Sequence, residues 1–245
     1  MSTPLSAQRI ETLQAKFEDS NPQAVLKWAS DTYGDQFVVV TSFQPTGIVT
    51  VHMLSEIAPK TSVYTLDTGL LFDETYTLIN QLEAQLKLKL TRITAELSVQ
   101  QQAEKHGDEL WKRDPDDCCN RRKTIPLRHA LKGFSAWATG LRRDQSEKRA
   151  NTPIISWDSR YNMIKLCPFA TWTEAMIWTY IHAYELPYND LHDKGYPTIG
   201  CYPCTKTVLD GEDPRSGRWS NHTKTECGIH FDTTHSTEKD QENNE

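Results

Sequence analysis

The hydrophobic and polar positions in the first half of the chain alternate between two kinds of segment. Segments with apolar residues at helical spacing predict helices, which cover residues 7–19, 22–28, 48–57 and 74–86. A short continuous apolar run at residues 37–40 predicts a strand covered on both faces, and further strands are predicted at residues 63–66, 88–93 and 136–140. Strands separated by helices of this length are typical of a parallel sheet. The pattern therefore predicts an α/β fold in which a parallel twisted sheet is flanked by helices.

The second half of the chain is less regular. A helix is predicted over residues 172–184 with Thr171 as its N-cap, whereas residues 186–219 are rich in Pro, Gly and Asp and predict an ordered loop. Residues 232–245 are polar and show no periodicity, so we expect them to be a disordered acidic tail. A single domain is predicted, whose parts are N-terminal helices in residues 1–35, the sheet and its helices, and a mobile C-terminal lid in residues 205–231, with the domain as a whole spanning residues 1–231.

Three loops follow predicted strands and contain polar or glycine-rich sequence. They lie at residues 42–47, 67–69 and 140–143. Ligands of parallel α/β sheets bind beyond the carboxyl ends of the strands. These three loops are therefore expected to share one rim, where a ligand would bind.

Composition and charge narrow the class of function. The 245 residues include 27 Lys and Arg against 33 Asp and Glu, a net charge of −6. Residues 232–245 contribute −4 of this charge, so the chain has no basic surplus of the kind that a generic nucleic-acid binder shows. No apolar run approaches the ~18 residues of a membrane span. The first residues lack the charged and apolar regions of a signal peptide, and we expect a cytoplasmic protein with reduced cysteines.

Four of the six cysteines form two pairs, Cys118-Cys119 and Cys201 with Cys204. Four thiolates are the ligand set of a structural zinc ion or of an iron–sulfur cluster. Zinc ligands usually arrive as two separated knuckles, whereas adjacent residues on a helix point about 100° apart. That difference favours a [4Fe–4S] cluster, although spacing alone does not settle the metal. Ordinary buried thiols together with a redox pair are the alternative.

The remaining cysteines have different surroundings. Cys227 has Lys224, Glu226 and His230 as neighbours, and a thiol near cations has more of the nucleophilic thiolate form. It is therefore a candidate nucleophile, with an incidental surface thiol as the alternative. Cys167 lies among apolar residues and is predicted to be a core residue.

Basic residues gather near these cysteines and in two loops. Arg122 and Lys123 follow the first cysteine pair, where they would stabilise an anionic cluster or simply form a solvated helix face. Arg side chains bind phosphate or sulfate bidentately. Those in the loops are Arg142, Arg143, Arg149, Arg215 and Arg218. Together with a thiolate, they suggest a doubly anionic substrate.

The combination of motifs resembles the assimilatory sulfonucleotide reductases, and most closely the cluster-containing adenylylsulfate (APS) reductases. The motifs that carry the resemblance are Leu-Asp-Thr-Gly at residues 66–69, the double cysteine with Arg122 and Lys123, Gly-Leu-Arg-Arg-Asp-Gln-Ser at residues 140–146, the Cys-x-x-Cys at residues 201–204, residues 211–219, and Glu-Cys-Gly-Ile-His at residues 226–230. They extend over most of the chain, from about residue 37 to residue 230.

The resemblance implies a fold, a cofactor and a set of site residues. The fold would be similar to the Rossmann-like adenine-nucleotide α-hydrolases. One [4Fe–4S] cluster per chain would be held by Cys118, Cys119, Cys201 and Cys204, and Lys123 would link the cluster to the substrate. Cys227 would be the catalytic nucleophile. The implied substrate-binding residues are Ser42, Leu66, Thr68, Gly140, Arg143, Arg149, Arg215, Arg218 and His230.

The implied reaction is the reduction of APS to sulfite and AMP in sulfate assimilation and cysteine biosynthesis. Cys227 would attack the sulfur of APS and carry an S-sulfonate. With four cysteines on the cluster and Cys167 buried, no internal thiol would remain to release it. Thioredoxin or glutaredoxin is therefore the expected reductant, and self-association into a homo-oligomer is left open.

The first loop departs from the family pattern. The family usually resembles Ser-Phe-Gly-Ala-Glu there, whereas this chain has Ser-Phe-Gln-Pro-Thr-Gly at residues 42–47. In the family this loop lies toward the ribose 3′ position, where phosphoadenylylsulfate (PAPS) carries a phosphate and APS does not. A PAPS or dual APS/PAPS reductase therefore stays open as an alternative. An adenylyl transferase of the same fold and a non-catalytic zinc-binding module would each leave Cys227 without a role.

Overall fold

Six strands form one sheet in the computed structural model, which describes residues 5–220, 222, 224 and 226–230. The strand order is β3-β2-β1-β4-β6-β5, and the neighbouring strands pair in parallel except for the antiparallel pair β5 and β6 at one edge. The strands are β1 Phe37–Val40, β2 Ser62–Asp67, β3 Lys89–Thr94, β4 Ala136–Ala138, β5 Ile155–Asp158 and β6 Met163–Leu166. The predicted α/β fold with a parallel sheet flanked by helices is confirmed.

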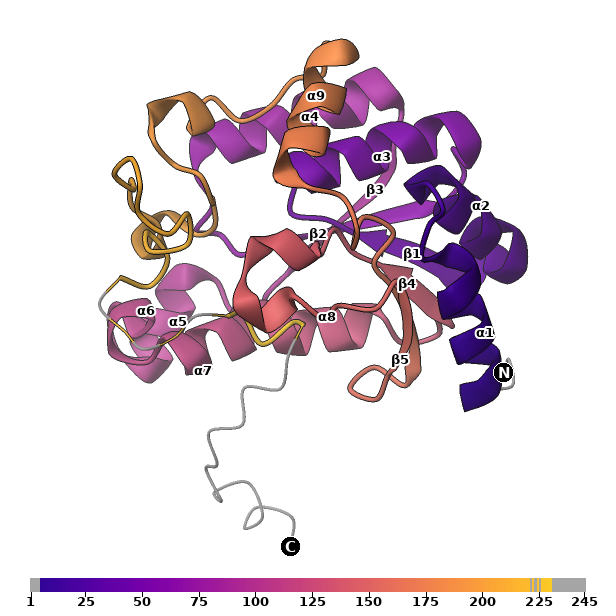
Figure 1. The fold of residues 1–245 in the computed structure, drawn as a ribbon. Coiled ribbons are helices and arrows are strands. Elements are labelled where there is room, and N and C mark those ends of the chain that lie inside the picture. The colour runs from indigo at the N-terminus through magenta and orange to yellow at the C-terminus, as the bar shows by residue number, and fades with distance from the viewer. Residues whose placement is uncertain (1–4, 221, 223, 225, 231–245) are drawn as a thin grey trace, which may run out of the picture.

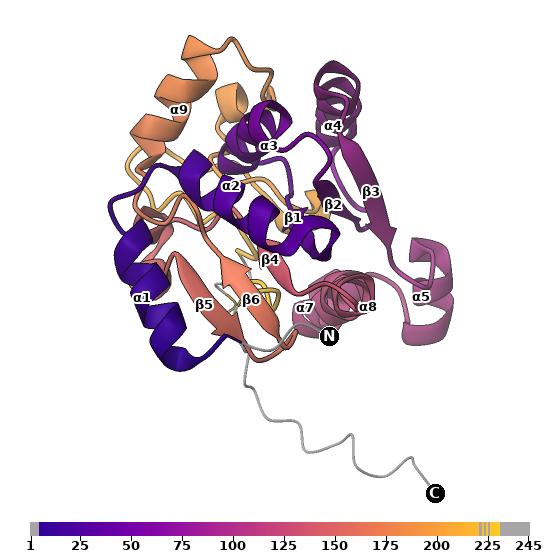
Figure 2. The ribbon, with the colours of Figure 1, turned by 90° about the vertical axis from the view of Figure 1, so that its right-hand side faces the viewer.

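Helices cover both faces of this sheet (Figures 1 and 2). The helices are α1 Ala7–Phe17, α2 Pro22–Tyr33, α3 Pro45–Ile57, α4 Asp73–Leu86, α5 Val99–His106, α6 Leu110–Arg113, α7 Pro115–Cys119, α8 Ile125–Ala130 and α9 Glu174–Ala183. Alternate residues of β1 serve the two faces, since Phe37 and Val39 pack with α1 to α4 and α9, whereas Val38 and Val40 pack with α8. The run of apolar residues in β1 is therefore explained by burial on both sides.

Helix starts follow the expected capping chemistry in one case and not in another. The side chain of Asn21 accepts a hydrogen bond from the backbone N–H of Ala24 and opens α2, the usual role of an asparagine before a proline at the first helical position. The predicted N-cap Thr171 is wrong, because the side chain of Thr173 accepts from the N–H of Met176 and opens α9 instead. Both threonines precede the same apolar pattern, and the tertiary position of the chain decides between them.

The hairpin of β5 and β6 was not predicted from the sequence. Its antiparallel register pairs Ile155 with Leu166 and Asp158 with Met163. The strands are only 4 residues long each, and Lys165 interrupts the apolar run of the second. Their short length hid the alternation that identifies a strand. The hairpin extends the sheet by two strands beyond β4.

The order of the sheet creates a topological switch between β1 and β4. β1 pairs with β2 on one side and with β4 on the other, so the chain leaves the two central strands in opposite directions. A crevice at such a point is where ligands of open α/β sheets bind. The loops at residues 42–47 and 140–143 therefore adjoin at the carboxyl edge.

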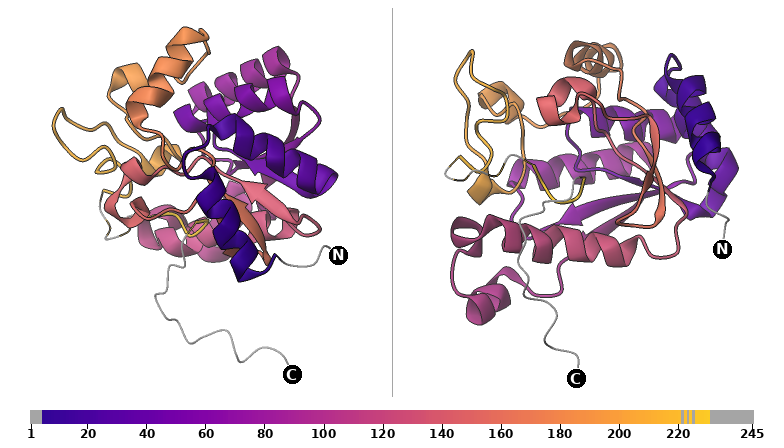
Figure 3. Two further views of the ribbon diagram at one scale, coloured as in Figure 1. Left: turned by 45° about the vertical axis from the view of Figure 1, so that its right-hand side comes forward. Right: turned by 60° about the horizontal axis from the view of Figure 1, so that its bottom comes forward.

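The last described residues return to this edge. Ile229 and the partly buried Cys227 pack against the α8 side of the sheet, next to Leu127 and Leu131. Figures 1 and 3 show this yellow segment running back beside α8. The predicted tail at residues 232–245 lies outside the described residues. Within the described part of the chain, no helix is long and apolar enough to cross a membrane.

Candidate functional site

The loop after β1 is held by side chains that depart from the family pattern. The hydroxyl of Thr46 accepts a hydrogen bond from Arg142 Nη1 at 2.6 Å, and the side-chain oxygen of Gln44 accepts from the backbone N–H of Ile199 at 3.0 Å. Phe43 is buried and has a φ of 53°, a left-handed conformation that is costly for a bulky residue. These contacts join the β1 loop to the loop after β4 and to the segment that carries the second cysteine pair.

The adjacent cysteines end α7. Asp114 caps this short helix through a hydrogen bond from the N–H of Asp117, and Pro115 occupies its first turn. Directly after Cys118 and Cys119, the chain widens into a π-helical turn over Asn120–Thr124. Such turns occur frequently at functional sites. Here the widened turn lies between the two cysteines and α8.

The second cysteine pair is brought to the loop after β2. Cys201 forms an antiparallel bridge with Leu71, and the N–H of Tyr202 donates to the carbonyl of Leu70 at 2.8 Å. The hydroxyl of Thr68 lies 3.3 Å from Cys201 Sγ. Cys201 therefore sits against the Leu-Asp-Thr-Gly loop, although more than 130 positions separate Thr68 and Cys201 in the sequence.

Arg122 ties the loop after β2 to the first cysteine pair. Its guanidinium donates to the carbonyl of Thr68, to the carbonyl of Leu97 and to the side chain of Gln102. Gln102 in turn donates to Cys118 Sγ at 3.8 Å. Arg122 is 4% exposed, so each of these bonds is made away from water.

Lys123 lies among the thiols of both pairs. Burial alone would lower the pKa of Lys123, but the thiolates of Cys201, Cys119 and Cys227 raise it above its ordinary value. The ammonium therefore stays charged and offsets negative charge on these sulfurs. Arg218 adds a second cation, which lies close enough to Lys123 to oppose its charge.

The four paired thiols have the chemistry of a metal–sulfur site. Cys118, Cys119 and Cys201 are buried, and Cys204 is partly buried beside Cys201 and Cys118, which raise its pKa together with burial. Thiolates are soft ligands of the kind that suits iron–sulfur clusters and zinc, and the nearby cations fit an anionic group. In residues 5–220, 222, 224 and 226–230, no three His, Cys, Asp or Glu side chains form a group that could hold a metal ion. The chemistry of the thiols suits a thiolate-bound group, but the described side chains are not gathered around a metal position, so the group stays a prediction.

Cys227 adjoins this thiol group. The neighbouring thiol of Cys119 and the nearby cations Lys123 and Lys224 lower the pKa of Cys227 against the effect of burial. Lys224 is itself held by an ion pair with Asp116 of α7. The arrangement favours a thiolate at Cys227.

Two of the predicted anion-binding arginines meet a carboxylate. Glu226 Oε1 and Oε2 accept from Arg149 Nε and Nη2 at 2.9 and 2.6 Å, and Oε2 accepts from Arg215 Nη2 at 3.2 Å. The hydroxyl of Ser146 donates to Oε1 at 3.2 Å. These side chains come from the loop after β4 and from the C-terminal segment, next to Cys227. The site therefore binds an oxyanion in the structure, and that oxyanion is Glu226.

His230 and its neighbours extend the same positive region. The ring stacks on Trp137 with centroids 5.8 Å apart, and its buried Nδ1 has no partner within the part of the chain that the structure describes. Burial lowers the pKa of His230 well below its usual value, and Lys165, Arg149 and other nearby cations lower it further. A neutral imidazole with an unoccupied nitrogen can bind an incoming polar group.

Arg143 and Arg218 lie apart from the Glu226 carboxylate. Arg143 is paired with Glu18 near the end of α1 and donates to the carbonyl of Thr152 at 2.9 Å. Arg218 stacks on Trp219, with its guanidinium carbon 4.4 Å from the ring centroid. The structure therefore brings Arg149, Arg215 and His230 together but directs Arg143 toward α1.

The remaining predicted substrate residues line the rim. Ser42 is exposed at the end of β1, and Leu66 is partly buried on the Cys227 side of the sheet. A Cβ on Gly140 would lie 3.2 Å from side-chain carbons of Thr46. Thr68 contacts Cys201, as described above. The strand ends thus gather these residues at the carboxyl edge.

Several site residues were missed by sequence reasoning. Gln102 carries no recognisable motif, and only folding brings it to Cys118. Asp116 is close to the cysteines in the sequence, but its pairing with Lys224 depends on the fold. Lys165 had one signal, namely a charge inside an apolar run, and its ammonium donates to the carbonyl of His230 at 3.4 Å. Glu226 was inside a recognised motif, but nothing in the motif indicates its partners.

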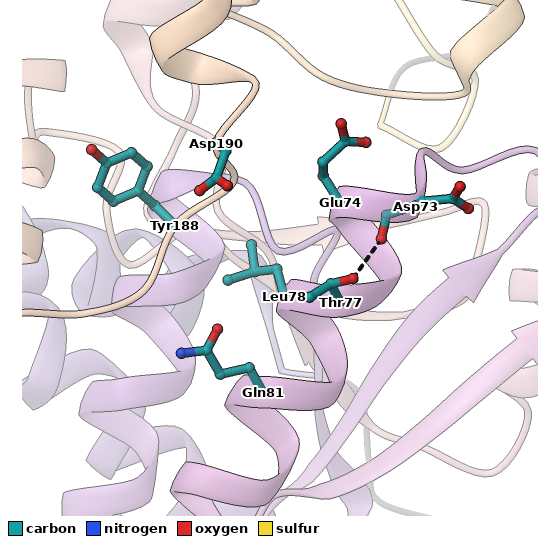
Figure 4. Close-up of a pocket in the computed structure, with 7 residues that line it drawn as sticks. All are labelled: Asp73, Glu74, Thr77, Leu78, Gln81, Tyr188 and Asp190. Carbon is teal, nitrogen blue, oxygen red and sulfur yellow. Dashed lines mark hydrogen bonds between the residues drawn. The ribbon is translucent and has the colours of Figure 1, made fainter.

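A cavity of about 420 Å³ lies away from this site. It is lined by Asp73, Glu74, Thr77, Leu78, Gln81, Tyr188 and Asp190. Figure 4 shows α4 facing the loop after α9 across this cavity. Its charged lining residues are all acidic, and they repel a sulfate or phosphate group. The second cavity, of about 140 Å³, adjoins the described site through Lys165 and Cys167.

A parallel α/β sheet with arginines and thiols gathered beyond its carboxyl edge has the layout of an anion-binding α/β protein. The sequence model of the phosphoadenosine phosphosulfate reductase domain matches residues 36–207. The chain belongs to this family.

Individual relatives agree with this assignment. The chain is 48% identical over 231 residues to the adenosine 5′-phosphosulfate reductase of Salinibacter ruber. The aligned region covers 94% of this chain and 91% of that protein. It is 46% identical over 222 residues to the enzyme of the same name from Halalkalibacterium halodurans, with 90% and 96% covered.

Solved structures support the fold. The phosphoadenylyl-sulfate (PAPS) reductase of Candida auris, solved as a phosphate complex, superposes with a TM-score of 0.76 at 32% identity, covering 85% of this chain and 100% of that one. The FMN adenylyltransferase of Candida glabrata superposes with a TM-score of 0.56 at 13% identity and covers 94% of this chain and 81% of its own, a likeness of fold alone.

Proposed function

We propose that this protein is a thioredoxin-dependent APS reductase, which reduces adenosine 5′-phosphosulfate to sulfite and AMP in sulfate assimilation. The observation that carries the proposal is the position of Cys227, a thiol of lowered pKa between Lys123, Lys224 and the Arg149–Arg215 site. The names of the relatives at 46–48% identity support APS as the substrate.

The substrate anion would be bound by this chain's own cations. Arg149, Arg215, Arg218 and His230 would hold the phosphosulfate, while Ser42, Leu66, Thr68 and Gly140 would lie toward the nucleoside. Arg143 would contribute only after leaving Glu18. An anion attacking an anion is opposed by charge repulsion, and fixed guanidinium groups offset this repulsion without reorganising.

The first chemical step would be attack by the Cys227 thiolate on the sulfur of APS. A sulfur–sulfur bond forms, the bond from that sulfur to the bridging phosphate oxygen breaks, and AMP leaves with the electron pair. Lys123 and Lys224 stabilise the attacking thiolate. The enzyme then carries an S-sulfonate on Cys227.

Release would need an outside dithiol. Its first thiolate attacks Cys227 Sγ, sulfite departs with the electron pair, and the second thiol resolves the mixed disulfide and regenerates Cys227. Thioredoxin or glutaredoxin has this chemistry. Residues 205–231 would act as the lid that carries Cys227 between substrate and reductant.

Cys118, Cys119, Cys201 and Cys204 would hold one [4Fe–4S] cluster. Four thiols from two segments, next to Lys123 and Arg122, support this ligand set. When bound, the cluster would supply an electrostatic environment rather than electrons, since the dithiol provides both. Cys119, the neighbour of Cys227, would then be a ligand and not a resolving thiol.

The nucleophile is tested by mixing the protein with APS, without reductant, and measuring intact mass. The native chain should gain one sulfonate, and C227S should gain none. The C167S variant is the matched control, because Cys167 is buried in the core. An adduct that persists in C227S contradicts the assignment.

The cofactor and the substrate each have a separate assay. Iron and acid-labile sulfide should both be present, and C201S should lose both; zinc without sulfide contradicts the cluster.

Sulfite release with APS and PAPS in parallel, with thioredoxin as reductant, compares the two substrates. A PAPS preference is the second candidate, supported by the likeness to the Candida auris enzyme.

A further inference from the structure

The proposed function gives Glu226 no task, although this residue lies in the same motif as Cys227. Its side chain is 5% exposed, and both carboxylate oxygens are bound. Arg149 binds it in the bidentate manner that guanidinium groups use for carboxylate, phosphate and sulfate alike. Ser146 and Arg215 complete the set of donors. Glu226 is therefore coordinated as a bound oxyanion ligand would be.

The surroundings favour an anion at this position. Lys165, Arg160 and Arg215 lie close enough to His230 to oppose its protonation. Arg160 is paired with Asp158 at 2.7 Å, whereas Arg149 and Arg215 share Glu226. Arg149 is buried, and a buried guanidinium without a counter-ion would be strongly unfavourable. An oxyanion is therefore favoured beside Arg149, whether it comes from the chain or from a ligand.

The same arginines are assigned above to the phosphosulfate. A guanidinium that donates Nε and Nη2 to Glu226 cannot present that edge to a sulfate oxygen. The carboxylate and the substrate anion are therefore competitors for one site. Because Glu226 directly precedes Cys227, the competition also affects where the nucleophile lies.

We propose that Glu226 is a positioning residue that stands in for the substrate anion: it occupies the Arg149–Arg215 site in the substrate-free protein, and phosphosulfate displaces it and frees the segment that carries Cys227. The inference rests on the proposed function. The substrate anion would replace the Glu226 carboxylate at the arginines, so that substrate binding and release of residues 226–230 would occur together.

A second contact keeps the exchange local. Lys224 is 5% exposed and is held by Asp116 and by the ring of Trp219, with its Nζ 5.4 Å from the ring centroid. Neither Arg149 nor Arg215 takes part in this contact. Displacement of Glu226 would therefore free the chain around Cys227 while Lys224 still holds the segment near α7.

The test measures binding without turnover. In a C227S background, which cannot form the adduct, APS affinity is compared by titration calorimetry with and without E226Q. Glutamine keeps the shape of the side chain but loses the charge that pairs with Arg149 and Arg215. If the docked carboxylate occupies the site in about nine molecules of ten, APS should bind about tenfold more tightly to the E226Q variant.

The matched control is E147Q, which removes one exposed charge two positions from Arg149. It should change APS affinity by less than about twofold. AMP, which lacks the sulfate, should gain much less than APS from E226Q. An APS affinity that is unchanged or weaker in E226Q overturns the proposal. That result is expected if Glu226 only holds Arg149 and Arg215 in place, because its neutralisation would then disorder the two arginines.

A second measurement covers a variant that folds poorly. In the C227S protein with Glu226 intact, APS should speed amide hydrogen exchange in residues 226–230, and slower or unchanged exchange there overturns the proposal. If C227S binds no APS at all, the proposed function fails. If APS binds equally well with and without E226Q, only the role of Glu226 fails.

Discussion

Arg122 connects the site at the scale of a single residue. One guanidinium donates to the buried carbonyl of Thr68 after β2, to the buried side chain of Gln102 and to the partly buried carbonyl of Leu97 before α5. A buried acceptor that loses its donor costs roughly 1–3 kcal/mol. The position of Cys118 relative to Cys201 therefore depends on a side chain that carries no chemistry of its own.

Replacing Arg122 with Lys should lower stability, because an ammonium cannot reach three acceptors in the geometry of a guanidinium fork. The midpoint of thermal unfolding should fall by several degrees, since about 1 kcal/mol corresponds to about 2–4 °C for a domain of this size. Arg121 is the matched control: its pair with Asp117 is partly exposed, and R121K should change stability by less than about 0.5 kcal/mol. Equal midpoints for the two variants would contradict this role of Arg122.

Cys167 is the cysteine that burial makes unreactive. Burial raises the pKa of its thiol to about 11, so it stays protonated at neutral pH. We expect iodoacetamide at about pH 8 to leave Cys167 unmodified in the native chain and to label it after denaturation, as measured by peptide mass spectrometry.

The sign of the pH effect follows from the same shift. An unfolded cysteine titrates near about 8.5, below the folded value, so the unfolded state releases its proton first as pH rises. The contribution of Cys167 to the free energy of unfolding is full below the unfolded pKa of about 8.5 and falls as pH rises toward the folded pKa of about 11. Rapid labelling of native Cys167 at neutral pH would show that its burial is transient.

At the scale of elements, the C-terminal segment depends on a close approach of two backbones. Residues 205 and 218 form an antiparallel bridge, and the N–H of Lys206 donates to the carbonyl of Gly217 at 2.9 Å. A Cβ on Gly217 would lie 2.3 Å from the carbonyl oxygen of Lys206. Only glycine permits this spacing, which carries Arg215 and Arg218 back toward the second cysteine pair.

The variant G217A should separate the two backbones and displace the arginines. We expect kcat/KM for APS to fall by about tenfold or more, equivalent to at least about 1.4 kcal/mol of transition-state stabilisation. The thermal midpoint should change little, because the bridge lies outside the main core. S216A, at the exposed neighbouring position, should keep full kcat/KM; a similar loss in both variants would count against the close approach.

At the scale of the whole molecule, the net charge is negative, but positive side chains gather around the candidate site. The chain carries −6, yet Lys123 and Lys224 lie close to Cys227, and Arg149 and Arg215 bind the preceding residue, Glu226. Such a local positive field attracts an anionic substrate and is screened by salt.

Raising KCl from about 0.05 M to about 0.5 M should therefore raise KM for APS about threefold or more, with a smaller effect on kcat. Steady-state assays at several salt concentrations measure this. The R215Q variant should have a shallower salt dependence, because one of the attracting charges is gone. A KM that does not change with salt would argue against electrostatic capture of the substrate.

The sequence by itself determined the sheet and its buried strands, because continuous apolar runs between amphipathic helices leave a parallel sheet as the stable arrangement. It also identified the two cysteine pairs and the basic loops, since their spacing is visible along the chain. It did not identify the short β5–β6 hairpin, and it placed the N-cap of α9 at Thr171 instead of Thr173. Both depend on which neighbour the chain packs against.

Only the tertiary structure decided how the charged residues pair. The motif residues Arg149, Arg215 and Glu226 were all visible, but that they bind one another depends on the return of the chain to the carboxyl edge. Arg143 was equally visible and is paired with Glu18 instead. Contacts between residues far apart in the sequence are set by burial and by the need to pair every buried charge, and neither can be read from local pattern.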